Sequence, residues 1–211
     1  MRIFENGIAV LAMCAGLAAC SGGSGEVPAI GAADMVLGKA DAPIEVIEYA
    51  STACSHCAEF ALDVFPAFKA KYLDTGQARY AVRELTNGPP AAIPYATAGF
   101  LLARCAGKDK YFDVLDAVYR GQKSWTNPGS FRQILLDIGL STGMTEAQFT
   151  ACVGDSKSVE AFNKRVEKNG VDSKHQGTPI FYVGGKQRFP NGLPTLEALD
   201  KAITEAKAEK K

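Results

Sequence analysis

Two cysteines separated by two residues, in Cys54-Ser55-His56-Cys57, are the part of this 211-residue sequence best suited to chemistry. Cysteines at this spacing form either a redox-active disulfide or half of a zinc site. A tetrahedral zinc site needs two further nitrogen or sulfur ligands. The remaining candidates are His175, Cys105 and Cys152, none of which belongs to a second close pair. The spacing therefore favours a redox pair over a metal site.

The residues around this pair predict a strand before it and a helix after it. Ile44–Ala50 is rich in β-branched residues and is bounded by turn-forming ones, which is typical of a strand. Apolar residues then recur at helical spacing, with Pro66 expected to kink or split the helix. The start of a helix favours a thiolate over a thiol. We expect Cys54 to be the reactive thiol and Cys57, one turn further on, to be the shielded resolving thiol.

The rest of the sequence predicts an α/β fold that is interrupted by helices. Gln77–Leu85 alternates as a second strand, so strand, helix and strand form a parallel crossover unit. The pattern is helical from 91 to 170, and strand character returns at Ile180–Val183. There Gly184-Gly185 indicates a hairpin to Lys186–Phe189, and an amphipathic helix ends the chain.

Taken together, these features resemble the DsbA-like branch of the thioredoxin-fold thiol-disulfide oxidoreductases, over about residues 36–205. The cysteine pair opens the first helix, and Thr178-Pro179 stands just before the hairpin, where the family has its cis-proline. Glu48 lies six positions before Cys54, where the family carries a buried carboxylate. A large helical insertion in the thioredoxin fold is the mark of the DsbA-like branch.

The resemblance implies roles for residues beside the two sulfurs. His56, like the helix N-terminus, would stabilise the Cys54 thiolate, and a stabilised thiolate makes the disulfide a strong electron acceptor. Glu48 would carry protons to and from Cys57, with a pKa raised by burial. These residues would all be catalytic, together with Thr178 and Pro179.

The proline loop and position 55 bear on the direction of exchange. A cis Pro179 would turn the backbone of Thr178 toward the sulfurs, where it can pair with an extended substrate. The best-known oxidases of the family have Val where this chain has Thr178 and Pro where it has Ser55. Thr before the proline also occurs in isomerase and reductase relatives. We expect a disulfide-donating oxidase, with a reductase or isomerase of the same fold as the alternative.

Cys105 and Cys152 both fall in the expected helical insertion. In an exported protein they are expected to form a structural disulfide between two insert helices. The alternative is a second shuttle pair, although neither cysteine lies in a Cys-x-x-Cys at a helix start. A further alternative is a soft ion such as Cu(I) on Cys54 and Cys57, against which the 4 Met and 2 His count. We expect no cofactor and no metal.

The N-terminal residues predict export. Arg2 precedes the apolar run Ile8–Ala19, which is too short to span a membrane and is typical of a signal peptide. Leu17-Ala18-Ala19-Cys20 resembles a bacterial lipobox, in which cleavage precedes a cysteine that receives lipid. The Gly/Ser stretch after Cys20 would act as a flexible tether. We expect a protein of the periplasm or extracytoplasmic membrane face, anchored by lipid on Cys20; ordinary cleavage nearby is the alternative.

Charge and length suggest the partners and the boundaries. The 23 basic and 23 acidic residues give no net charge, which disfavours a nucleic-acid binder. A neutral protein also has no net field that would attract one class of charged partner over another. The expected partners are unfolded or reduced exported proteins and a membrane redox partner that reoxidises the pair. Isomerase relatives usually add a dimerisation domain, for which 25–40 is too short, and we expect a monomer. The expected parts are a signal peptide (1–19), a tether (20–35), a first thioredoxin part (36–90), the insertion (91–170) and a second thioredoxin part (171–211).

Overall fold

A five-stranded mixed sheet forms the centre of the protein in this computed structural model, which describes residues 27–125, 128–174, 176–189 and 192–210. The strand order is β1-β3-β2-β4-β5, with β2 and β3 parallel and the other neighbours antiparallel. The expected α/β thioredoxin fold with a helical insertion is confirmed. The strands are β1 (Met35–Leu37), β2 (Ile44–Ala50), β3 (Ala78–Glu84), β4 (Ile180–Val183) and β5 (Lys186–Phe189).

The helix that follows β2 changes its hydrogen-bond pattern along its length. It runs as α1 (Ser55–Glu59), a π-helical stretch (Phe60–Val64), α2 (Phe65–Phe68) and a second π-helical stretch (Lys69–Leu73). Pro66 lies just inside α2, where the wider π turns give way to α geometry. Proline lacks a backbone N–H, so a change in the hydrogen-bond ladder accommodates it there. The helix is therefore divided at Pro66 rather than ended.

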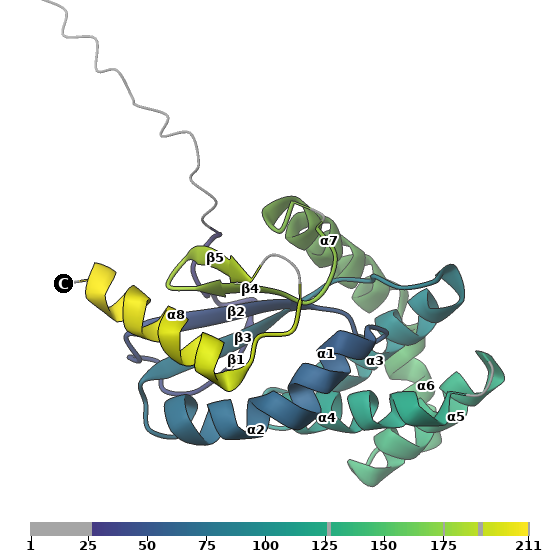
Figure 1. The fold of residues 1–211 in the computed structure, drawn as a ribbon. Coiled ribbons are helices and arrows are strands. Elements are labelled where there is room, and N and C mark those ends of the chain that lie inside the picture. The colour runs from purple at the N-terminus through teal and green to yellow at the C-terminus, as the bar shows by residue number, and fades with distance from the viewer. Residues whose placement is uncertain (1–26, 126–127, 175, 190–191, 211) are drawn as a thin grey trace, which may run out of the picture.

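A group of helices separates β3 from β4 in the sequence. They are α3 (Ile93–Cys105), α4 (Tyr111–Gly121), α5 (Pro128–Ser141), α6 (Glu146–Gly154) and α7 (Ser156–Asp172), and α8 (Leu196–Glu209) follows the hairpin. Figure 1 shows α3 to α6 gathered at one end of the sheet, with α1, α2 and α8 along one side. The insertion thus forms a helical lobe beside the start of α1.

The two faces of the sheet bury separate groups of side chains. Alternate residues of a strand point to opposite faces. Val46, Glu48 and Ala50 therefore share the face that packs against α1 and α2, while Ile47 and Tyr49 point to the other. That second face is covered partly by the segment that precedes β1. The carboxyl group of Glu48 is consequently carried into the larger apolar core.

The segment before β1, which the sequence placed in the expected tether (20–35), contacts the sheet. Val27 is buried against the second face of the sheet, and its N–H donates to the carbonyl of Gly185. Asp34 forms an ion pair at 3.0 Å with Arg83, which is only 5% exposed. Loss of Asp34 from this site would leave the buried guanidinium of Arg83 without its charged partner, which is costly. The packed part of the chain therefore includes 27–34, a stretch whose many small residues did not distinguish it from a tether.

Candidate active site

Cys54 occupies the N-cap of α1, where a side chain can accept hydrogen bonds from free backbone N–H groups. The N–H of Cys57 donates to Cys54 Sγ at 3.3 Å. The Cys57 thiol, the Thr178 side chain and the backbone N–H of His56 add to this and together lower the pKa of Cys54 to about 6, against the opposing effect of partial burial. At neutral pH the group is therefore largely a thiolate.

Cys57 lies in the opposite environment, although only one helical turn separates the two sulfurs. Its side chain is 0% exposed, and both cysteines are present as free thiols. Burial, the hydrogen bond to Cys54 and the charge of Glu48 raise the pKa of Cys57 well above the ordinary value for a thiol. The pair thus combines one accessible thiolate with one buried, protonated thiol, a division typical of thiol–disulfide exchange.

Glu48 is a buried carboxyl on the central strand, 2% exposed. Burial raises its pKa to about 8, because the charge is poorly solvated there, even though a hydrogen bond from Tyr80 opposes the shift. Its Oε1 has no hydrogen-bond partner among the described residues. The charges of Glu48 and Cys57 act on each other, so the carboxyl and the buried thiol are coupled.

The loop before β4 lies against the reactive sulfur. The Thr178–Pro179 peptide bond is cis, as the resemblance implied. When Cys54 is protonated, its thiol donates to the carbonyl of Thr178 at 3.4 Å, a contact between residues 124 positions apart in the sequence. Pro179 itself is buried. The loop therefore supplies a backbone segment next to Cys54, the place where an extended substrate could pair.

His56 is exposed at the second position of α1. Its backbone N–H contributes to lowering the pKa of Cys54. Its imidazole makes no hydrogen bond within the part of the chain that the structure describes. His56 thus lowers the pKa of Cys54 through its backbone N–H, and no hydrogen bond of its ring to another described residue adds to this effect.

The insertion holds the active-site loop through a residue that the sequence did not single out. Gln122, in the turn after α4, donates from its side-chain amide to the carbonyls of Thr52 (2.7 Å) and Cys54 (3.2 Å). Thr52 in turn donates to the carbonyl of Ala96 on α3. Gly99 allows this close approach, because a Cβ there would stand 2.9 Å from Thr52 Oγ1. Gln122 can be recognised as a residue that holds the loop between β2 and α1 only from this contact in the folded structure.

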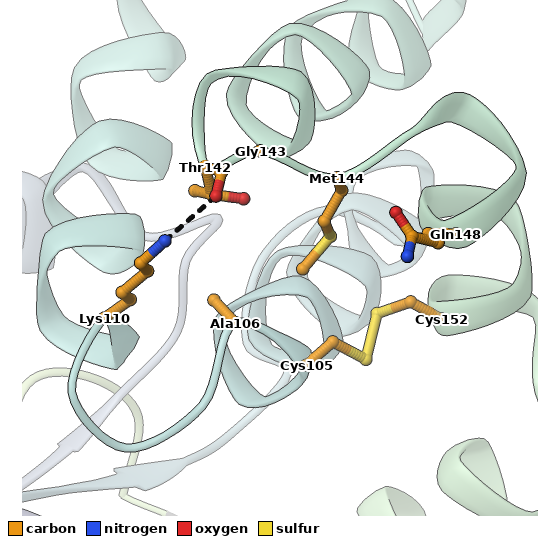
Figure 2. Close-up of a pocket in the computed structure, with 8 residues that line it drawn as sticks. All are labelled: Cys105, Ala106, Lys110, Thr142, Gly143, Met144, Gln148 and Cys152. Carbon is orange, nitrogen blue, oxygen red and sulfur yellow. Dashed lines mark hydrogen bonds between the residues drawn. A yellow bond between two sulfur atoms is a disulfide. The ribbon is translucent and has the colours of Figure 1, made fainter.

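A disulfide joins Cys105 at the end of α3 to Cys152 on α6, as expected from the sequence. Figure 2 shows it among the residues that line a cavity within the insertion, which also include Met144 and Gln148. The cavity has a volume of about 320 Å³. None of the residues that line this cavity belongs to the loop around Cys54. The bond is therefore a connection between insert helices, separate from the reactive pair.

Several expectations from the sequence concern residues outside the described ranges. Cys20, the signal peptide and the whole Gly/Ser stretch after Cys20 lie there, as does His175. Within those ranges, no helix has both the length and the apolar character needed to cross a bilayer. Nor do three or more His, Cys, Asp or Glu side chains gather there as a metal ion would require.

Known proteins show the same fold and sequence pattern. The thioredoxin family model matches residues 32–205. A protein of Rickettsia bellii named "Putative protein-disulfide oxidoreductase" is 35% identical over 82% of this chain and 66% of its own length. Disulfide bond formation protein D of Bacillus subtilis is 26% identical over 80% of this chain and 76% of its own. This chain thus spans a little under two thirds of the rickettsial relative.

Among solved structures, α-DsbA1 of Wolbachia pipientis superposes with a TM-score of 0.72 and 26% identity, covering 85% of this chain and 96% of that one. The likeness includes the insertion as well as the sheet, since nearly all of that chain is matched. The chain described here belongs to the thioredoxin family and is a DsbA-like member of it.

Proposed function

We propose that this protein is a dithiol oxidase that passes the Cys54–Cys57 disulfide to cysteines of exported proteins. The observation that carries the proposal is the unequal pair: a Cys54 thiolate held at the start of α1 beside a buried Cys57 thiol. The names of the rickettsial and Bacillus relatives support the same activity. A stabilised thiolate lowers the free energy of the reduced protein. Its disulfide therefore accepts electrons from substrate thiols more readily and is passed on to the substrate.

The exchange proceeds through a mixed disulfide. A substrate thiolate attacks Cys54 Sγ, the Cys54–Cys57 bond breaks, and Cys57 leaves as a thiolate. The Glu48 carboxyl, protonated at neutral pH, gives its proton to that buried sulfur. A second substrate thiolate then attacks the substrate sulfur of the mixed disulfide and expels Cys54 as a thiolate. The substrate loses two electrons, and the enzyme ends as the dithiol.

The protein must then be reoxidised, and the direction of exchange depends on that step. A membrane redox partner that accepts two electrons from the dithiol would restore the disulfide and complete the cycle. If a membrane donor supplied electrons instead, the same residues would work as a reductase or isomerase. Thr178 and Ser55, which differ from their counterparts in the best-known oxidases, border the Cys54 sulfur and help to set this balance.

The first test is loss of Cys54 Sγ, the sulfur that the substrate thiolate attacks. A Cys54→Ser variant should lose turnover of a reduced, unfolded substrate protein, with disulfide formation followed by loss of free thiols. Glu59→Gln, on the exposed face of α1, is the matched control and should keep normal turnover. Unchanged turnover in Cys54→Ser would contradict the mechanism.

Export and anchoring are proposed on the N-terminal sequence alone, with lipid on Cys20 as the anchor. The full chain expressed in a bacterium should label with a fatty-acid analogue and sediment with membranes. Cys20→Ser should abolish the label and move the protein to the soluble extracytoplasmic fraction. Labelling that persists in Cys20→Ser, or a wild type found wholly in the cytoplasm, would contradict the anchor.

A further inference from the structure

The hydroxyl of Tyr80 on β3 donates to Glu48 Oε2, and this contact lies entirely inside the protein. Tyr80 is 3% exposed and Glu48 is 2% exposed. In the parallel register, Tyr80 lies opposite Val46 and Glu48 lies opposite Val82, so the tyrosine and the carboxyl are diagonal neighbours on one face of the sheet. The contact is therefore fixed by the two central strands.

The tyrosine acts as a donor throughout the working pH range. Burial and the adjacent Glu48 carboxyl raise its pKa well above the ordinary value near 10. Because the Tyr80 hydroxyl keeps its proton, it donates a hydrogen bond to Glu48 Oε2, and Oε2 is the acceptor. Oε1 has no hydrogen-bond partner among the described residues. In the neutral carboxyl, the acidic proton is then favoured on Oε1.

We propose that Tyr80 is a positioning residue for proton transfer: by engaging Oε2 it keeps the transferable proton of Glu48 on Oε1, free to pass to the Cys57 thiolate. The proposal rests on the proposed function, since it concerns the proton that Cys57 gains when the disulfide opens. In that step the neutral carboxyl and the thiolate become a carboxylate and a thiol. The Tyr80 hydrogen bond then remains in place to stabilise the carboxylate.

Few other groups act on this carboxyl. Cys54 and Cys57 face it from α1, and Tyr119 approaches the same interior from α4. On the β4 side, the residue opposite Glu48 is the apolar Phe181. Tyr119 is a buried tyrosine whose hydroxyl has no hydrogen-bond partner within the described ranges. It is thus a close match for Tyr80 in size and burial, without the contact to Glu48.

The experiment compares Tyr80→Phe with Tyr119→Phe, each of which removes one buried oxygen. The Cys54 sulfur is first joined to glutathione, and the release of glutathione by Cys57 is followed across pH. This release runs the proton transfer in reverse, because the Glu48 carboxylate takes the proton of Cys57. The same variants are titrated through the carboxyl carbon resonance of Glu48, assigned by its absence in Glu48→Gln.

Loss of the donor should make the carboxylate less stable. In Tyr80→Phe, both the Glu48 titration and the release profile should move up by about one pH unit, with release roughly threefold to tenfold slower at pH 7. Tyr119→Phe should keep the wild-type midpoint. Equal behaviour of the two variants, or no shift in Tyr80→Phe, would overturn the proposal.

Two further observations keep this result separate from folding and from the function itself. In the wild-type protein, the ring carbon of Tyr80 that bears oxygen should report the Glu48 titration near pH 8, and that response should vanish in Glu48→Gln; its absence in the wild type would also overturn the proposal. If Cys54→Ser kept its turnover while Tyr80→Phe shifted the titration, the proposed oxidase would fail and the Tyr80 contact would stand.

Discussion

The reactivity of the site comes from two thiols that share one helix start but differ in solvation. Cys54 has hydrogen-bond donors around its sulfur, whereas Cys57 is enclosed by apolar side chains and faces Glu48. Within one helical turn, the protein therefore stabilises the thiolate at Cys54 and disfavours it at Cys57. This difference supplies both a good leaving group and a protected resolving thiol.

Cys54 should titrate well below an ordinary thiol. In the reduced protein, alkylation by iodoacetamide should follow a midpoint near pH 6, as the pKa of Cys54 is lowered to about 6. The Cys57 thiol is the largest cause of the shift, so Cys57→Ala should move the midpoint upward. Mass spectrometry of the modified peptide measures the rate at each pH. A wild-type midpoint near that of the urea-unfolded chain would contradict the assignment.

Glu48 should make the folded state less stable as pH rises. Its pKa is near 4.5 when solvated and about 8 in the folded protein, so between these values the folded state binds the extra proton. Below pH 4.5 the carboxyl is protonated in both states and does not destabilise the fold. As the pH rises toward 8, the unfolded state ionises more readily, and the free energy of unfolding falls. The free energy of unfolding of Glu48→Gln should therefore exceed that of the wild type by roughly 2–4 kcal/mol at pH 8, and by little at pH 4.5.

Urea unfolding of the two reduced proteins at both pH values measures this difference. Glu59→Gln on the exposed face of α1 is the control, and its stability relative to the wild type should not change with pH in the same way. A Glu48→Gln variant whose advantage did not grow between the two pH values would show that Glu48 is not a strained, buried carboxyl.

At the scale of elements, the site is an assembly of three separate parts of the chain. The strand β2 and the start of α1 carry Glu48 and the cysteines, and the loop before β4 brings Thr178 to the sulfur. The insertion adds Gln122, which holds the loop between β2 and α1. The insertion is thus part of the active site as well as a lobe beside it.

Removing the Gln122 amide should loosen this connection. Gln122→Ala loses two hydrogen bonds to loop carbonyls and should cost about 1–2 kcal/mol of unfolding free energy. Gln133→Ala is a matched control, because its amide bonds only to Asp137 on the exposed side of α5. Urea unfolding compares them. If Gln122→Ala cost no more than Gln133→Ala, the amide would not be holding the loop.

Local patterns were sufficient to predict most of these elements. The bounds of β2, β4 and β5 agree with the sequence prediction because turn residues mark where the strands end: Pro43 and Ser51 bound β2, and Gly184-Gly185 separates β4 from β5. β1 was missed because it has only three residues and pairs with a strand far along the chain: Met35, at one end of the register, lies opposite Val82, 47 positions later. No periodicity can be measured over so short a segment.

For the site, the sequence supplied the residues next to recognisable motifs and missed those that depend on packing. Cys54, Cys57, Glu48 and Pro179 have motif positions that could be matched to a family. Tyr80 could have been found from the parallel pairing, since every second residue of β3 shares the face of Glu48. Gln122 gave no such signal, because nothing in its neighbourhood predicts which loop the helical insertion would contact.

For the whole molecule, stability is shared between the central sheet and a helical lobe tied by one disulfide. Cys105 and Cys152 close a loop with a sequence separation of 47 residues. Closing a loop of that size restricts the unfolded chain, so the double change Cys105→Ala, Cys152→Ala should cost about 2–4 kcal/mol. The Cys54 alkylation midpoint should not move. An unchanged urea midpoint would show that the bond adds no net stability.

Whether the protein donates its disulfide depends on the reduction potential of the Cys54–Cys57 pair. Equilibration with glutathione buffers, followed by quantification of the two redox forms, gives the value. A potential of about −120 mV, that of a strong oxidant, is the result that the proposed oxidase predicts. A potential near about −270 mV, like that of thioredoxin, would contradict the oxidase and favour a reductase.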